Sequence, residues 1–169
     1  MSDSARPSMD LFGEALRDFF NGEHSAQVLL RRDDGLDETL PISIFFQRLP
    51  ELTAIERQAL NLSNGRVLDI GAGAGRHTLI LQERGRMVTA LDVSHDAVEV
   101  MKLRGVRNPI HGDLFAFSGG PFDTLLLLMR SVGMAGDLDG LNRFFGIARG
   151  LLSPRGFNRH RCRGLPENG

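Results

Sequence analysis

A glycine-rich loop stands out as a place where the chain could contact a ligand with its backbone. The stretch DIGAGAG, residues 69–75, places the carboxylate of Asp69 and three alternating glycines directly after an apolar run. Glycine has no Cβ, so the backbone can turn sharply there and approach a ligand closely. If a helix begins at Arg76, its free N–H groups and partial positive charge favour an anionic group. The spacing therefore predicts a loop that binds a nucleotide-like ligand.

Two familiar nucleotide-binding loops do not fit this stretch. The dinucleotide fingerprint G-x-G-x-x-G, counted from Gly71, requires a third glycine where Arg76 stands, and the phosphate loop requires a G-K-[ST] sequence that is absent. The chain also has no tyrosine. A nicotinamide-dependent oxidoreductase is therefore disfavoured.

Two further carboxylates follow apolar runs and are candidates for the same site. Asp92 ends the run MVTALD, and Asp113 ends IHGD. The carboxyl ends of parallel strands share one edge of a sheet, where a carboxylate can accept hydrogen bonds from ribose hydroxyls. A purely structural interpretation of each stays open: Asp69 could support its loop, Asp92 could cap the next helix, and Asp113 could belong to a turn.

Strands and helices alternate in the segment that carries these residues. The apolar runs predict strands over 66–70, 87–92, 108–113 and 123–129, and the helical spacing predicts helices over 76–84, 94–104 and 138–152. This order favours an α/β fold with a doubly wound, mostly parallel sheet. We expect the last helix to bury one face, formed by Leu138, Leu141, Phe145, Ala148 and Leu152.

The first 62 residues predict a separate cap, with helices over 8–20 and 52–62 around an irregular or hairpin-like segment at 28–47. Phe45, Phe46 and Arg48 could close over the site, although a core role fits the two phenylalanines better. Arg76 could bind a ligand carboxylate, but such a side chain is more often solvated. We expect His77 and His95 on the surface.

The glycine stretch, together with Asp92, Asp113 and the run FDTLLLLM, resembles the class I S-adenosylmethionine-dependent methyltransferases, and the chain is similar to small bacterial methyltransferase-domain proteins over residues 66–156. The resemblance implies a Rossmann-like sheet in strand order 3-2-1-4 and S-adenosylmethionine as the cofactor. It also implies methyl transfer to an unidentified acceptor, with a small molecule as one candidate.

The resemblance also implies the residues of the site. The Asp113 position contacts the adenine amine, the Leu114 N–H reaches the adenine ring, and the end of the fourth strand at Met129 faces the methyl group. Arg130, Ser131 and Met134 are candidates for the acceptor pocket. The implied cofactor contacts are Asp69, Gly71, Ala72, Gly73, Gly75, Asp92, Val93, Asp113, Leu114 and Met129.

Composition limits the other classes of function. The formal net charge of −1 argues against nucleic acid as a partner. No apolar run approaches the roughly 20 residues that cross a bilayer, and the polar start MSDSARPSMD lacks the pattern of a signal peptide, so we expect a cytoplasmic protein. His160 and Cys162 are too sparse for a metal site, and no metal is expected.

The segment 154–169 departs from the family pattern. A fifth apolar strand should follow LLSP, but residues 155–164 contain four arginines and no strand pattern. A native basic extension and a truncation both explain this, and we favour truncation. The expected organisation is a cap over 1–62, a cofactor-binding core over 63–153 and a basic tail over 154–169. The fourth strand would then be an exposed edge that a homodimer could cover. A non-catalytic cofactor-binding remnant or assembly subunit is the alternative function.

Overall fold

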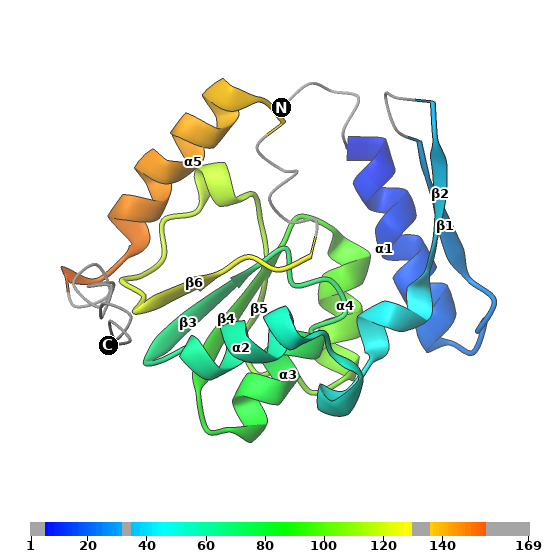
Figure 1. Ribbon diagram of the computed structural model, residues 1–169, viewed down its shortest axis with the longest axis horizontal. Coiled ribbons are helices and arrows are strands. Elements are labelled where there is room, and N and C mark those ends of the chain that lie inside the picture. The colour runs from blue at the N-terminus through cyan, green and yellow to red at the C-terminus, as the bar shows by residue number, and fades with distance from the viewer. Residues whose placement is uncertain (1–5, 32–34, 130–135, 155–169) are drawn as a thin grey trace, which may run out of the picture.

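The computed structural model describes residues 6–31, 35–129 and 136–154. Its centre is a parallel sheet of four strands, β3 (Arg66–Ile70), β4 (Met87–Asp92), β5 (Pro109–His111) and β6 (Thr124–Leu126), in the order β5-β4-β3-β6. Numbered from β3, this is the expected order 3-2-1-4 (Figure 1). The Rossmann-like α/β prediction is therefore confirmed. The fourth strand is shorter than expected, because pairing with β3 covers only residues 124–126.

Helices cover both faces of this sheet, as a doubly wound fold requires. On one face, α2 (Ala54–Leu62) and α3 (Arg76–Glu83) pack against Val67, Val88 and Leu126. The neighbouring α4 (His95–Leu103) packs against Ala90. On the other side of the sheet from α2 and α3 lies α5 (Leu138–Leu151), as Figure 1 shows. Its Leu151 is buried in one cluster with Leu68 and Leu91 of the sheet. Successive strand residues therefore face different helix layers, and the strands are apolar on both sides.

The buried face of α5 differs from the one expected. Leu138 and Phe145 are 79% and 60% exposed, whereas Leu151 is buried and Phe144 and Ile147 pack beside it against the sheet. Ala148 is buried as predicted. The helix is apolar over a wide arc, so its sequence allowed more than one buried face. The face that includes Phe144 packs against the same core cluster as Leu125 and Leu127 of the neighbouring strand segment.

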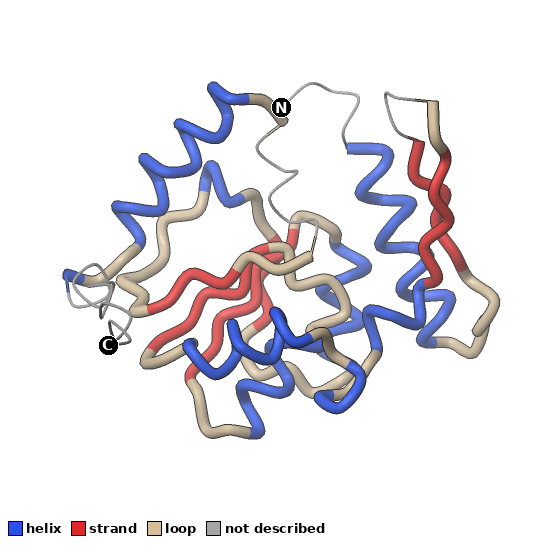
Figure 2. The backbone as a smooth tube through the Cα atoms, in the orientation of Figure 1, coloured by secondary structure: helices blue, strands red, loops and turns tan. Residues whose placement is uncertain are grey.

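The cap consists of a helix, a hairpin and two short turns of 3₁₀-helix. Helix α1 (Arg6–Phe20) packs against α4, and β1 (Gln27–Arg31) pairs antiparallel with β2 (Asp37–Pro41). Figure 2 shows this hairpin beside α1 and apart from the parallel sheet. The chain then passes through η1 (Ile42–Phe46) and η2 (Leu49–Glu51) into α2. The hairpin interpretation of the cap is thus confirmed, and the cap leads directly to the start of the core.

One short contact extends the sheet beyond β6. Phe122 and Leu152 form an isolated parallel bridge. Phe122 N donates to Leu151 O at 2.8 Å, and Ser153 N donates to Phe122 O at 2.7 Å. The next residue, Asp123, donates its N–H to Arg66 O at the start of β3. Because successive residues of a strand point their polar groups to opposite sides, Leu152 lies at the edge of β6 away from β3. In the described residues, no helix is long and apolar enough to cross a membrane.

Candidate cofactor site at the carboxyl ends of the strands

The glycine loop joins β3 to α3 and adopts a backbone that only glycine accepts readily. The φ angles of Gly71, Gly73 and Gly75 are 69°, 56° and 76°, all in the left-handed region. Gly75 is also the N-cap of α3. Every second residue of the loop thus has a left-handed backbone, which explains the alternation of glycine in the sequence.

The N–H groups of this loop are used within the protein. Gly71 N and Ala72 N both donate to Leu91 O, at 2.8 and 3.2 Å, and Gly75 N donates to Ala72 O at 2.8 Å. Gly73 N donates to Asp92 Oδ2 at 2.8 Å. These four N–H groups of the loop are therefore not available to a ligand, whereas the free N–H groups expected from the sequence are those of the helix that begins at Arg76. The glycines instead fold the loop over the end of β4 and remove side chains from its surface.

The third glycine has a packing role in addition. A Cβ atom on Gly75 would lie 2.8 Å from Val106 Cγ2, closer than packing allows, and 3.0 Å from Met101 Cγ, which is a tight contact. A Cβ atom on Gly73 would lie 3.8 Å from Phe45 Cδ1, an ordinary contact. Gly75 therefore permits the close approach of α3 to α4, while Gly73 lies beneath the cap.

Asp69 and Asp92 are both buried at strand ends but support different neighbours. Thr78 Oγ1 donates to Asp69 Oδ2 at 2.7 Å, which ties β3 to the first turn of α3. Asp92, 3% exposed, accepts from Gly73 N with one oxygen and from Ser94 N, at 2.9 Å, with the other. Burial raises the pKa of both carboxyls, and hydrogen bonds to Asp92 from Ser94 and Gly73 oppose the rise in its pKa.

Asp92 therefore joins two predicted parts of the site. It holds the middle of the glycine loop against the turn that starts α4. The helix itself is capped by Ser94, whose Oγ accepts from Ala97 N, as its position in the sequence predicts. The interpretation of Asp92 as the cap of α4 is therefore wrong: Ser94 caps the helix, and Asp92 accepts a hydrogen bond from Ser94 N.

The end of β5 brings the remaining adenine-side residues to the same edge. Asp113 is the N-cap of a short 3₁₀-helix, η3 (Leu114–Ala116), and accepts from Phe115 N at 2.9 Å. Gly112 N donates to Asp92 O, and His111 Nε2 lies 2.9 Å from Val93 O. Leu114 is buried in the core beneath. Asp92 ends β4 as predicted, but β5 ends at His111, so Asp113 lies two residues beyond the strand and caps a 3₁₀ turn instead of ending the strand. Both carboxylates are nevertheless at the carboxyl edge of the sheet.

Met129 follows β6 with an unusual backbone. Its φ is 60°, which is rare for a residue other than glycine, and its side chain is partly exposed. A left-handed conformation raises the energy of such a residue by about 1–2 kcal/mol and often accompanies a functional position. The other candidates for the acceptor pocket, Arg130, Ser131 and Met134, lie outside the described residues, as do His160 and Cys162.

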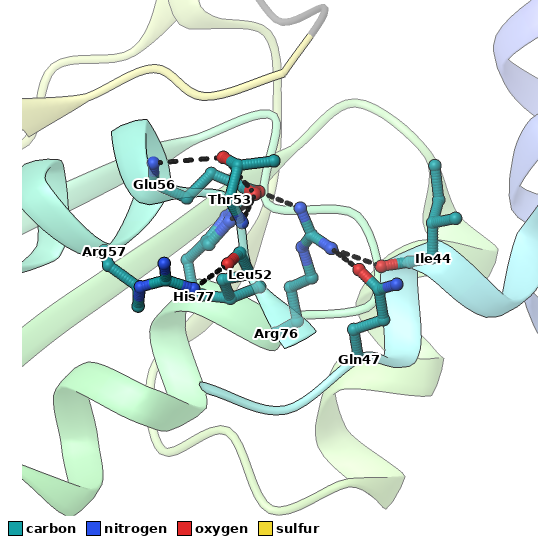
Figure 3. Close-up of polar contacts among 8 residues, drawn as sticks. All are labelled: Ile44, Gln47, Leu52, Thr53, Glu56, Arg57, Arg76 and His77. Carbon is teal, nitrogen blue, oxygen red and sulfur yellow. Dashed lines mark hydrogen bonds and ion pairs between the residues drawn. The ribbon is translucent and has the colours of Figure 1, made fainter. Parts of the chain in front are cut away.

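Arg76 and His77 overturn the expectations made for them. Both are buried, at 5% and 6% exposure, and both contact Glu56 Oε1 of α2 (Figure 3). Arg76 also donates to Ile44 O and to Gln47 Oε1, the latter at 2.9 Å. Arg76 is therefore neither solvated nor free to bind a ligand carboxylate, and His77 is not a surface residue. The pattern Thr53-x-x-Glu56, a capping box, was the one sequence signal for Glu56.

Two of the cavities on the described surface lie away from the glycine loop. One, of about 420 Å³, is lined by α5 residues including Phe145 and Arg149. The other, of about 360 Å³, lies at the amino ends of the strands near Arg66, Arg86 and Arg107. Among residues 6–31, 35–129 and 136–154, no group of three or more His, Cys, Asp or Glu side chains could hold a metal ion.

A parallel sheet with a glycine loop after β3 and a carboxylate at the end of β4 defines the arrangement expected of a class I methyltransferase. A family model described as "Methyltransferase domain" matches residues 68–157, more than half of the chain. The chain therefore belongs to the methyltransferase-domain family of class I S-adenosylmethionine-dependent methyltransferases.

Solved structures and curated proteins agree with this assignment. A methyltransferase from Bacteroides fragilis in complex with S-adenosyl-L-homocysteine is 36% identical, with a TM-score of 0.78, over 88% of this chain and 62% of its own. The glycopeptide N-methyltransferase MtfA complexed with S-adenosylmethionine is 26% identical, with a TM-score of 0.54, over 61% of this chain and 50% of its own. A ubiquinone biosynthesis O-methyltransferase of Xylella fastidiosa (strain 9a5c) is 35% identical over 38% of this chain and 29% of its own length.

The matches differ in how much of this chain and of each relative they cover. The match to the Bacteroides protein covers more of the chain than the core over 63–153 can supply, so it includes part of the cap. The chain spans 62% of the Bacteroides protein and about three tenths of the Xylella enzyme.

Proposed function

We propose that the chain binds S-adenosylmethionine at the glycine loop and transfers its methyl group to a small-molecule acceptor in the cytoplasm. The observation that carries this proposal is the hydrogen bond from Gly73 N to Asp92 Oδ2, which holds the carboxylate at the end of β4 against the glycine loop. The similarity to the Bacteroides protein, whose structure holds S-adenosyl-L-homocysteine, supports the same ligand class here. The net charge of −1 favours a small molecule over nucleic acid as acceptor.

The chemistry of the residues fits an adenosyl group. Each oxygen of Asp92 accepts one backbone N–H, and a carboxylate oxygen has a second lone pair that can accept from a ribose hydroxyl. Asp113, half-buried two residues beyond the end of β5, presents a second carboxylate at the same edge of the sheet, suited to an exocyclic amine. Residues 71–75 of the glycine loop are all glycine or alanine, so the loop carries no bulky side chain. Asp92, Val93 and Asp113 would hold the nucleoside, and the turn at Met129 would face the transferred group.

The reaction needs placement more than acid–base chemistry. When bound, S-adenosylmethionine supplies a methyl group on a sulfonium, which a lone pair of the acceptor attacks in line as the carbon–sulfur bond breaks. The protein therefore contributes by holding acceptor and donor in one orientation, and that can account for much of the rate. A neutral amine attacks without prior loss of a proton, whereas a hydroxyl requires a base of matched pKa.

The relatives differ in the atom that is methylated. The Xylella relative is named as an O-methyltransferase and MtfA as an N-methyltransferase. We therefore propose a screen in which release of S-adenosylhomocysteine is measured with two panels of small molecules, phenols and amines. Turnover confined to one panel identifies the acceptor atom.

The first test is calorimetric titration of the purified chain with S-adenosylhomocysteine. We expect saturable binding at one site, weakened at least about tenfold by Asp92→Ala, because the substitution removes both the ribose acceptor and the support of Gly73. Asp139→Ala, at an exposed position on α5, is the matched control and should bind like the wild type. A folded wild-type chain that gives no binding heat would refute the proposal.

The alternative is a cofactor-binding subunit without activity that associates through β6. In the described residues, Thr124–Leu126 of β6 pairs in a ladder only with β3, and an unpaired strand edge favours association. Binding of S-adenosylhomocysteine, a defined homodimer in sedimentation and no turnover in either acceptor panel would favour this alternative. A monomer with turnover would exclude it.

A further inference from the structure

The cap segment 42–47, which includes η1, contacts the glycine loop and its supports at three points. The Phe45 ring lies over Gly73, close enough that a Cβ there would be 3.8 Å from Cδ1. The guanidinium of Arg104, at the end of α4, lies 4.6 Å from the centre of the Phe46 ring and donates to Ala74 O in the loop. Ile44 and Gln47 accept from Arg76, the residue directly after the loop.

Arg76 is the centre of this contact, as Figure 3 shows. One end of its guanidinium pairs with Glu56 Oε1, and the other donates to the cap at Ile44 O and Gln47 Oε1. The second oxygen of Glu56 accepts from Thr53 N and Thr53 Oγ1 at 2.9 and 2.8 Å. A single side chain thus links α3 to two separate parts of the preceding chain.

Burial of Arg76 and Glu56 means that their ion pair depends on a fixed geometry. The side chains of Arg76 and Glu56 are 4% and 9% exposed, so neither charge can exchange its partner for water without a rearrangement of the backbone. A buried ion pair is stable only when its geometry and hydrogen bonds are kept. The planar guanidinium can satisfy acceptors on two sides only if the cap and the first turn of α3 keep fixed relative positions. Because Gly75 and Arg76 are adjacent, that requirement extends to the loop.

We propose that Arg76 is a positioning residue that couples the cap segment 42–47 to the glycine loop, so that the two become ordered together. The consequence for ligand binding rests on the proposed function: a ligand on the loop also stabilises the cap, and an ordered cap increases affinity at the loop. The coupling is reciprocal because it is a free energy shared by two sites.

Hydrogen exchange of the ligand-free chain tests the coupling directly. We expect Arg76→Gln to raise the exchange rates of amides in residues 42–47 and 71–75 together by about tenfold, because local opening of one frees the other. Arg84→Gln is the matched control, since Arg84 also links α3 to α2, through Asn61 Oδ1, but at the exposed far end of the helix. Unchanged exchange at 71–75 in a folded Arg76→Gln chain would overturn the proposal.

A second pair of variants guards against loss of folding. Gln47→Ala removes one cap contact and leaves the Glu56 pair intact, and Arg76→Lys keeps the charge but loses the planar fork. Both should raise exchange at 71–75 by a smaller factor than Arg76→Gln. An effect confined to residues 42–47 in both variants would contradict the coupling.

Titration with S-adenosylhomocysteine then separates this proposal from the proposed function. In the wild type, the ligand should slow exchange at 42–47 as well as at 71–75. In saturated Arg76→Gln, only 71–75 should be protected. Protection of 42–47 to the wild-type extent in that variant would overturn the coupling. A wild type that binds no ligand but shows linked exchange would refute the cofactor assignment and leave the coupling supported.

Discussion

At the scale of single residues, three buried carboxylates show that burial alone does not decide the charge of a group. Burial raises the pKa of Asp69 and Asp92, and donors from neighbouring groups reduce that rise without cancelling it. Burial also raises the pKa of Glu56, but donors from Thr53 and His77 and the charge of Arg76 outweigh it, so that its pKa is lowered overall. Of these three buried carboxylates, Glu56 is therefore the one whose lowered pKa makes its charge a contribution to stability at neutral pH.

The charge of Glu56 predicts a pH dependence of stability. Because its pKa is lowered in the folded state, its contribution is complete above the ordinary value of 4.5 and is lost as pH falls through the lowered value. Glu56→Gln, which leaves Arg76 unpaired, should reduce the free energy of unfolding by about 3 kcal/mol at pH 7.

Urea denaturation of wild type and Glu56→Gln between pH 7 and pH 3.5 measures this difference. The gap between the two should be constant above pH 5 or so and should narrow below it. Glu83→Gln, at an exposed position on α3, should differ little from the wild type. A gap that stays the same at low pH would show that the charge of Glu56 is not what stabilises the fold.

Substitution by alanine should change the free energy of unfolding in opposite directions at two glycines. Gly75→Ala should lower the free energy of unfolding by about 3 kcal/mol, because φ is 76° and the new Cβ would meet Val106 and Met101. Gly146→Ala, in the interior of α5 with open space around it, should raise it by about 0.5–1 kcal/mol. Equal effects in urea denaturation would mean that the loop has space that this structure does not show.

At the scale of elements, α5 offers a test of which face packs. Leu151→Ala should reduce the free energy of unfolding by about 3 kcal/mol, since Leu151 is buried against the sheet. Phe145→Ala, in the same helix but exposed, should change it by less than about 0.5 kcal/mol. The reverse ranking in thermal or urea denaturation would restore the face predicted from the sequence.

The sequence predicts best those helices and strands that have a clear hydrophobic pattern and a residue that marks where the element begins or ends. The bounds of β3 and β4 agree with their apolar runs, and Ser94 caps α4 where its position predicts. The fourth run, DTLLLLM, is apolar throughout, so it carries no signal for where pairing ends. In the structure the ladder stops where Leu126 pairs with Asp69, one residue before β3 itself ends at Ile70.

At the scale of the whole molecule, the strand-end side of the site could be predicted, whereas the cap side could not. Parallel topology brings Asp92 and Asp113 to the edge that carries the loop, so knowing the strands sufficed. The partners of Arg76 lie 20 to 32 residues earlier in the chain. Ile44 and Gln47 belong to the segment 28–47, for which the sequence predicts no regular helix, and Glu56 lies in α2. No local sequence pattern encodes how the hairpin and the 3₁₀ turn place Ile44 and Gln47. The sequence therefore predicts a solvated side chain for Arg76, although it is buried.

The bridge between Phe122 and Leu152 has a consequence for how copies of this chain could assemble. Two copies related by a two-fold axis normal to their sheets would join their β6 edges in opposite directions. The bridge has the same direction as β6 and already uses both polar groups of Phe122. Symmetric pairing along the full edge therefore requires that residues 151–153 first leave Phe122. The bridge thus opposes self-association at this end of the edge, whereas the unpaired edge of β6 favours it.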